Sequence, residues 1–372
     1  MTRRGTATLP LHSGSAPRWL FDRMVELGDA IAALLVDEYG PDELVRRLAD
    51  PYWFQALGCT LGFDWHSSGL TTTTMGALKE ALDPDRHGLA VAGGKGATGR
   101  RTPVELRSDP HGLGGGTTTD LVRTSRLSAK VDNACLQDTF TLYHHAMVVS
   151  ETGGWAVVQQ GMNDRDARRY HWLDEDLVTF VEAPHSAIAS QRSVAEVLDL
   201  TAVSSDAARA VSVDLAKEPP ARLKRYLTPM QRTLADYGAT GPPVPAADGP
   251  HLAMPTHHRL READLSERTL DQLEAAYELQ PRGYEELVAI EGVGPATVRA
   301  LALIAELVYD AKSSREDPAK YAYAHGGKDG TPRPIDPDQY DRSIDFLEEL
   351  VEGAEVDRET RQAALHRLHE LV

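Results

Sequence analysis

Cysteine is nearly absent from this 372-residue chain, which contains only Cys59 and Cys135. Both stand in apolar contexts, ALGCTLGF and NACLQD, without the paired spacing of a redox or zinc motif. We therefore expect two buried free thiols.

Long hydrophobic runs are missing as well. The longest, residues 30–36, is far shorter than the roughly 20 residues that cross a bilayer. The N-terminal segment MTRRGTATLPLHSG has no apolar stretch behind its arginines, which a secretory signal would require. We expect a cytoplasmic protein without a membrane partner. A content of 41% hydrophobic and 26% charged residues suits a chain of two or three globular domains.

Lysine is scarce: only eight of the 39 basic residues are lysines, and 56 acidic residues bring the net charge to −17. This composition is typical of proteins from salt-loving organisms, in which the total charge reflects the solvent more than the partners. It argues against nucleic-acid binding through bulk charge, because phosphates need cations. Residues 92–130 reverse the balance, with seven basic and three acidic residues.

Helical periodicity dominates both ends of the chain. The pattern WLFDRMVELGDAIAALLVDEYG predicts a first helix, and Pro51 is expected to close a second. Gly-, Thr- and His-rich segments with short apolar runs then indicate mixed structure, before helical patterns return at SVAEVLDL. We expect an α+β protein, in which a mixed α/β domain with a short antiparallel hairpin precedes an all-helical C-terminal domain. The expected divisions are a His-rich domain over 1–190, a helical extension over 191–237, a linker over 238–258 and a helical domain over 259–372.

The segment YEELVAIEGVGPATVRALALIAELVY, residues 284–309, predicts two helices joined by a glycine turn. It resembles the helix-hairpin-helix motif of DNA repair proteins. Glycines let the turn approach a phosphate, and the N–H groups of the following helix attract an anion. The resemblance implies DNA as the partner, gripped by its backbone without sequence reading. The candidate DNA-binding residues are Gly292, Val293, Gly294, Thr297 and Arg299.

This hairpin is not expected to carry chemistry itself. Base-excision glycosylases with a similar hairpin have a lysine soon after the glycines and an aspartate about twenty residues beyond. Here Ala296 and Thr297 take the first place, and Ser313 and Ser314 take the second.

The segment YHHAMVVSETGGWAVVQQGMN, residues 143–163, predicts paired strands around a Glu-Thr-Gly-Gly turn. Because side chains alternate faces along a strand, one histidine and one glutamine should share a face. We consider His144 and His145 as catalytic candidates on this hairpin. A histidine and glutamine surface on a sheet is the alternative.

Four further segments supply candidate site residues. GFDWHSSG places Asp64 two residues before His66, which suits a metal or phosphate ligand pair. SRLSAKVDN places Asp132 after Lys130 on a helical segment, with Lys130 sharing the face of Arg126 and Asp132 off it. The Gly-rich AGGKGATGRR suits a phosphate cradle, and the arginine pair of ARRYHWL suits bidentate phosphate contacts. The phosphate-binding candidates are Lys95, Arg100, Arg101, Arg126, Arg168 and Arg169.

Two phosphodiesterase families show partial resemblance to these segments. His144, Glu151, Gly161 and Asn163 echo the layout of the phospholipase D superfamily, although Ala146 stands where that motif has lysine. Metal-dependent nucleases offer Asp132 before a strand with glutamines in place of their Glu-x-Lys. Both comparisons point to phosphodiester chemistry, and both lack the family lysine.

Across the chain, RRGTATLPLHSG, GFDWHSSG, AGGKG, SAKVDN, QQGMN, ARRYHWL and AHGGKDG together resemble domain of unknown function 763, a family of archaea and thermophilic bacteria. The resemblance brings no activity with it.

Our first hypothesis is a DNA-processing nuclease. His66, Asp132, His144 and His145 would act as acid, base or metal ligands, and Lys95, Lys130 and Arg168 would hold phosphate. A divalent metal, on Asp64, His66 and Asp132, is the cofactor this set would take. The alternatives are a glycosylase or lyase in which Lys130 forms a Schiff base, and a DNA-binding adaptor without chemistry.

Overall fold

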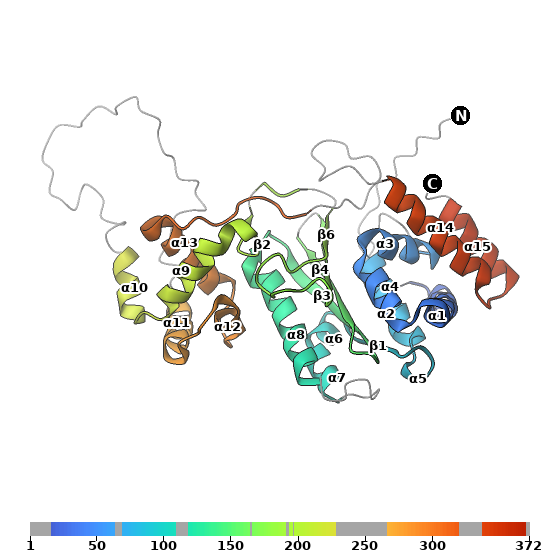
Figure 1. The fold of residues 1–372 in the computed structure, drawn as a ribbon, viewed down its shortest axis with the longest axis horizontal. Coiled ribbons are helices and arrows are strands. Elements are labelled where there is room, and N and C mark those ends of the chain that lie inside the picture. The colour runs from blue at the N-terminus through green and yellow to red at the C-terminus, as the bar shows by residue number, and fades with distance from the viewer. Residues whose placement is uncertain are drawn as a thin grey trace, which may run out of the picture.

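The computed structural model describes residues 16–63, 69–108, 118–163, 166–190, 193–195, 197–227, 266–319 and 337–369. A central sheet lies between two groups of helices (Figure 1). Asp64, His66 and the expected linker at 238–258 lie outside the described residues.

The sheet has five antiparallel strands in the order β1-β3-β4-β5-β6. Its central hairpin, β3 and β4, confirms the paired strands expected around the Glu-Thr-Gly-Gly turn. Gly153 occupies the left-handed region in this turn, with φ +98°. The strands are β1 (Leu89–Lys95), β3 (Thr141–Ser150), β4 (Trp155–Met162), β5 (Ala167–Leu173) and β6 (Ala187–Ser190). A second sheet pairs β2 (Leu136–Gln137) with β7 (Leu198–Asp199).

One group of helices packs on the sheet face that presents Ala146, Val148 and Val158. It combines helices from both ends of the chain, because Leu347, Leu350 and Leu368 join the same core. These helices are α1 (Arg18–Tyr39), α2 (Pro41–Ala49), α3 (Pro51–Thr60), α4 (Leu70–Ala81), α14 (Pro337–Gly353) and α15 (Arg358–His369), with α5 (Pro84–His87) preceding β1.

The second group covers the face that presents Met147, Val157 and Trp172. It includes α8 (Thr118–Lys130), which continues into the π-helix η1 (Val131–Cys135), together with α9 (Asp206–Ala216), α11 (Glu267–Leu279), α12 (Tyr284–Ala289) and α13 (Pro295–Tyr309). The remaining elements are α6 (Ala97–Arg100), α7 (Thr102–Ser108), η2 (Val203–Ser205) and α10 (Pro220–Leu227).

The α+β fold class is confirmed, with a small antiparallel sheet and a helical C-terminal region. The described helices of residues 259–372 contribute to two different cores, α11–α13 to one and α14–α15 to the other. The domain boundaries themselves stay predictions.

One local expectation was wrong, and another was confirmed but incomplete. SVAEVLDL was expected to be helical, but Leu198 and Asp199 form strand β7 and pair with β2, so a tertiary contact overrides the local pattern. Pro51 does separate two helices, yet it also opens α3, where its missing N–H costs nothing.

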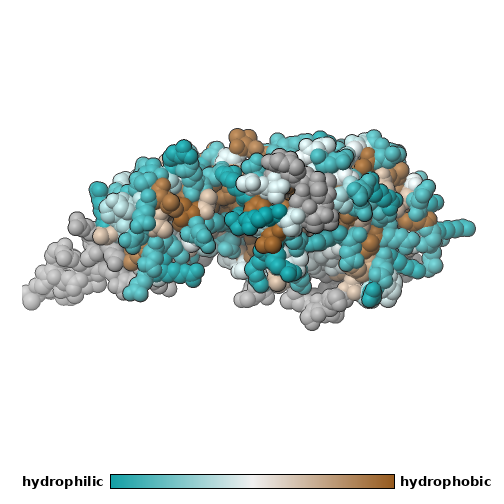
Figure 2. Space-filling view, turned by 90° about the horizontal axis from the view of Figure 1, so that it is seen from below, coloured by the Kyte–Doolittle hydropathy of each residue, from teal (hydrophilic) through white to brown (hydrophobic). Residues whose placement is uncertain are grey.

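Both cysteines are free and buried, as expected. Among the helices of the described ranges, none combines the length and the apolar character needed to cross a membrane. The face seen from below, on the side of α7, is mainly hydrophilic, with apolar residues in small separate patches (Figure 2).

Candidate functional site

Along the direction of its strands, the sheet has an apolar end and a polar end. Near the β3–β4 turn its strands carry valine, tryptophan and leucine, which fill the two cores. Towards the opposite end, polar side chains of β3, β4 and β5 are paired across the register. We call this the polar end of the sheet; it comprises Lys95, Tyr143, His144, His145, Gln159, Gln160, Arg168, Arg169 and Tyr170.

The two histidines face opposite sides of the sheet. His145 pairs with Gln159, which pairs with Tyr170, on the face covered by α8; we call this the α8 face. His144 pairs with Lys95 and with Gln160 on the opposite face, which α2–α4 cover; we call this the α3 face. The expectation that each histidine shares a face with one glutamine is confirmed.

A chain of directed hydrogen bonds crosses the α8 face. The hydroxyl of Ser125 lies 2.8 Å from Nε2 of His145, and Nδ1 of His145 lies 2.9 Å from Oε1 of Gln159. The Gln159 amide donates to Oδ2 of Asp132 at 2.6 Å. Because Gln159 Oε1 can only accept, Nδ1 of His145 carries the hydrogen and Nε2 accepts from Ser125. Burial lowers the pKa of His145, which agrees with a neutral ring.

Asp132 is the centre of this network. It lies in the π-helix η1, and the wider π turn directs its side chain inward instead of onto the surface. Besides Gln159, it accepts from Nε1 of Trp172 at 3.0 Å and contacts Nε2 of His185 at 2.5 Å. Asp132 has no exposed surface. π-Helical turns are frequent at functional sites.

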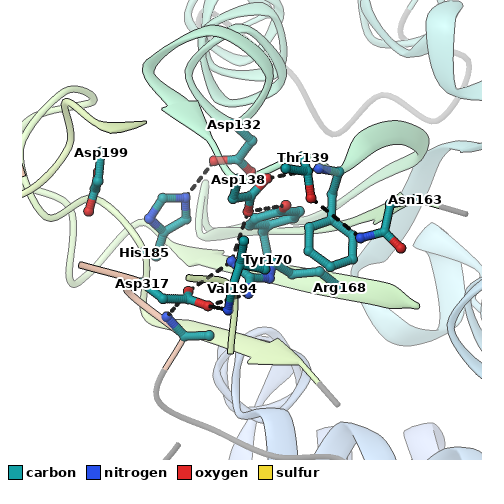
Figure 3. Close-up of polar contacts among 12 residues, drawn as sticks. Asp132, Asp138, Thr139, Asn163, Arg168, Tyr170, His185, Val194, Asp199 and Asp317 are labelled. Atoms are coloured by element: carbon teal, nitrogen blue, oxygen red, sulfur yellow. Dashed lines mark hydrogen bonds and ion pairs between the residues drawn. The ribbon is translucent and has the colours of Figure 1, made fainter. Parts of the chain in front are cut away.

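A buried ion-pair cluster lies beside Asp132 (Figure 3). Arg168 is fully buried and donates to Asp138 at 3.0 Å and to both oxygens of Asp317 at 2.9 and 2.7 Å. The hydroxyl of Tyr170 donates to Asp138 at 2.7 Å. Burial raises the pKa of Asp138 to about 6, against the lowering effect of Arg168. Asp317 follows α13 in sequence, so this cluster ties the C-terminal region to the sheet.

Strained backbone lies beside Asp138 and close to His185. Thr139, directly after Asp138, has φ +74°, which is rare for a β-branched residue. Ala183, two residues before His185, has φ +43°. Each such residue costs on the order of 1–3 kcal/mol, and such strain concentrates at active sites and ligand-binding positions.

The α3 face holds Arg169 in neutral surroundings. Its guanidinium donates to Nε2 of His171 at 2.7 Å, to Oε1 of Gln55 at 3.0 Å and to the carbonyl of Pro51 at 3.1 Å. His144 is also buried, and among the residues that the structure describes neither of its ring nitrogens has a hydrogen-bond partner. Burial lowers its pKa to about 3, assisted by the neighbouring imidazole of His145 and the ammonium of Lys95.

The glycines of AGGKGATGRR have a packing role. A Cβ on Gly93 would lie 2.3 Å from the carbonyl oxygen of His145, and one on Gly99 would lie 2.5 Å from that of Gly94. The N–H of Gly93 already donates to the carboxylate of Glu105 at 2.8 Å. Instead of one loop, the segment forms the end of β1 and the short helix α6, and its basic side chains, Lys95, Arg100 and Arg101, are exposed.

The α12–α13 turn has the conformation that its sequence predicts. Gly292 is left-handed with φ +89°, and Gly294 is extended at the start of α13. Gly292 and Pro295 are exposed, whereas Val293 and Thr297 are buried. Any ligand would therefore meet the backbone of the turn, not these two side chains.

This turn is attached to α8 and β2, the elements on either side of η1. Nζ of Lys130 donates to the carbonyl of Ile290, and burial lowers the pKa of Lys130. Gln137, which precedes Asp138, donates to the carbonyl of Pro295 at 2.8 Å and accepts from Arg299 at 3.4 Å. The helix α13 also packs against η1. The glycine turn and the Asp132 network are thus neighbours.

The structure brings some predicted residues together and separates others. Asp132, His145 and Gln159 form one network, whereas Glu151 lies at the far end of β3 from His144. Arg168 and Arg169 lie on opposite faces, buried among internal partners. Within the described ranges, no group of three His, Cys, Asp or Glu residues could hold a metal. The sequence reasoning missed Ser125, Asp138, Tyr170, His185 and Asp317.

One protein family, described as "Protein of unknown function (DUF763)", matches residues 5–335. The chain belongs to the DUF763 family. The matched range contains the whole sheet, the Asp132 network and the α12–α13 turn, so these are parts of the DUF763 region, whereas α14 and α15 follow it. No curated protein and no solved structure matches the chain. The DUF763 description assigns no activity, and a function has to be argued from the site.

Proposed function

We propose that the protein binds the DNA backbone through the α12–α13 turn and cleaves a phosphodiester bond at the adjacent polar end of the sheet. The observation that carries this proposal is that the α12–α13 turn is attached beside Asp132 and Asp138. A glycine turn that can admit a phosphate is held by Lys130 and Gln137, which lie next to Asp132 and Asp138 in sequence.

The turn supports backbone binding in two ways. Gly292 and Gly294 add no side chains to the turn, so at these positions a phosphate can reach main-chain N–H groups. The first turn of the fifteen-residue helix α13 adds the partial positive charge of a helix N-terminus. The nearby Glu291 is exposed and opposes binding, so cations from elsewhere on the surface have to contribute.

The cations come from the 92–130 segment. Lys95, Arg100, Arg101 and Arg126 are exposed, and none of them forms an ion pair with any described residue. In an acidic protein this surface is the one suited to neutralise phosphates.

The lyase alternative has one observation in its favour, the lowered pKa of Lys130. Its Nζ nevertheless already donates a hydrogen bond to the carbonyl of Ile290, and this contact holds the α12–α13 turn. Borohydride trapping of an abasic duplex on Lys130 would favour the lyase, and binding without any product, with or without divalent metal, would favour an adaptor.

Changing Lys95, Arg100 and Arg101 together to glutamine is expected to weaken duplex binding and flatten its salt dependence. Each lost phosphate contact should lower the slope of log Kd against log salt by about 1. Fluorescence anisotropy at several salt concentrations measures this, alongside cleavage assays of the parent on duplex, single-stranded and branched DNA.

The matched control changes three exposed arginines of α1 and α15 to glutamine, namely Arg18, Arg23 and Arg358. It removes the same charge from the end of the molecule that lies opposite α12 and α13 (Figure 1). Equal slopes for the two triple variants would remove the 92–130 segment from the interface.

A further inference from the structure

His185 is the histidine of this region whose second nitrogen can meet a substrate. Nε2 of His185 contacts Oδ1 of Asp132 at 2.5 Å, and its side chain is held between that carboxylate and the indole of Trp172, 4.8 Å away between ring centroids. His185 is partly exposed as a residue, whereas the histidines of the sheet are buried, and its side chain is 7% exposed. Within the described ranges, Nδ1 of His185 has no protein hydrogen-bond partner.

The ring nitrogens of the other histidines in this region either have hydrogen-bond partners already or are enclosed by the protein. His145 uses both nitrogens, with Ser125 and Gln159. His171 uses both as well, with Arg169 and the carbonyl of Leu48. His144 is enclosed on the opposite face. These three are suited to structural roles, and they leave His185 as the residue able to exchange a proton with a ligand.

Asp132 fixes the tautomer of His185. A carboxylate accepts hydrogen bonds only, so the hydrogen of the neutral imidazole lies on Nε2 and the lone pair lies on Nδ1. Two other donors, Gln159 and Trp172, hold the same carboxylate in place. A base oriented by a second group, which is itself held from behind, is the arrangement found in hydrolytic active sites.

We propose that His185, oriented by Asp132, is the general base of the reaction. Nδ1 of His185 removes a proton from a water molecule as the water oxygen forms a bond to phosphorus. The bond from phosphorus to the leaving oxygen breaks, that oxygen takes a proton from solvent, and the proton on His185 returns to solvent. This inference rests on the proposed function, because it needs a phosphodiester bound beside the α12–α13 turn.

Substitution of His185 or Asp132 tests this pair directly. His185→Gln is expected to reduce turnover by at least about 100-fold while changing the DNA Kd by less than about twofold, since a general base acts on the transition state. Asp132→Asn should also reduce turnover. The exposed His366→Gln on α15 serves as the control and should behave like the parent. A His185→Gln protein that cleaves like the parent overturns the proposal.

A second measurement on the unmodified chain does not depend on turnover or on the folding of a variant. Imidazole ¹⁵N NMR with a phosphorothioate duplex is expected to shift the Nδ1 resonance of His185 and leave that of His366 unchanged. Binding without a shift overturns the proposed role of His185 and Asp132, but it leaves DNA binding by the α12–α13 turn in place. Absence of any DNA binding overturns both.

Discussion

Replacing Arg168 with methionine is expected to lower the free energy of unfolding by about 3–5 kcal/mol, because it leaves two buried carboxylates without a cation. Asp138 is fully buried and Asp317 nearly so, and both are ion-paired with the guanidinium of Arg168. Chemical denaturation at pH 7 measures the loss. The further changes Asp138→Asn and Asp317→Asn should restore part of it, since they remove the uncompensated charges.

The matched control is Arg46→Met. Arg46 also makes a bidentate ion pair, with Glu175, but both side chains are almost half exposed. Solvent screens such a pair, so the control should cost no more than about 1 kcal/mol. Equal losses for Arg168→Met and Arg46→Met would show that the buried cluster does not tie the C-terminal region to the sheet.

Stability is expected to fall on mild acidification because three histidines are buried in neutral form. Burial lowers the pKa of His144, His145 and His171 in the folded protein. The unfolded chain binds protons near pH 6.5 and the folded chain does not, so stability is lost as the pH falls below that value. The free energy of unfolding should be roughly 2–3 kcal/mol lower at pH 6 than at pH 8.

Asp138 acts in the opposite direction. Its folded-state pKa of about 6 lies above the ordinary value, so it favours the folded state as the pH falls from about 6 towards 4. The histidines therefore dominate above pH 6. In His144→Leu the loss between pH 8 and pH 6 should shrink by about one third, whereas the exposed His366→Gln should leave it unchanged. A parent whose stability is flat over this range would contradict neutral burial.

The sequence was most informative where a pattern is local. The β3–β4 hairpin, its alternation of His144 and His145, and the glycine turn before Pro295 are all encoded within about twenty residues. Strand alternation and glycine geometry are properties of the backbone, so short segments suffice to predict them.

The site was less predictable because it is assembled from distant segments. Asp317 and His185 are single polar residues in irregular segments, and nothing beside them indicates that they meet Arg168 and Asp132. Asp132 was expected off the face of Lys130, and the structure agrees, because Asp132 is buried in η1 whereas Lys130 reaches the carbonyl of Ile290. The glycines of β1 and α6 suggested a phosphate cradle, but close packing against His145 also requires them.

DNA binding by Gly294→Val compared with Gly283→Val tests the central claim most directly. Both glycines are extended residues that precede a helix, so neither substitution requires left-handed backbone, and neither added Cβ would meet a close neighbour. Gly292 is less suitable alone, because its φ of +89° would add strain. We expect Gly294→Val to weaken duplex binding at least about tenfold, since its side chain keeps phosphate from the turn, and Gly283→Val to bind like the parent. Equal affinity of Gly294→Val and the parent, with circular dichroism showing both folded, would contradict a DNA grip at the α12–α13 turn.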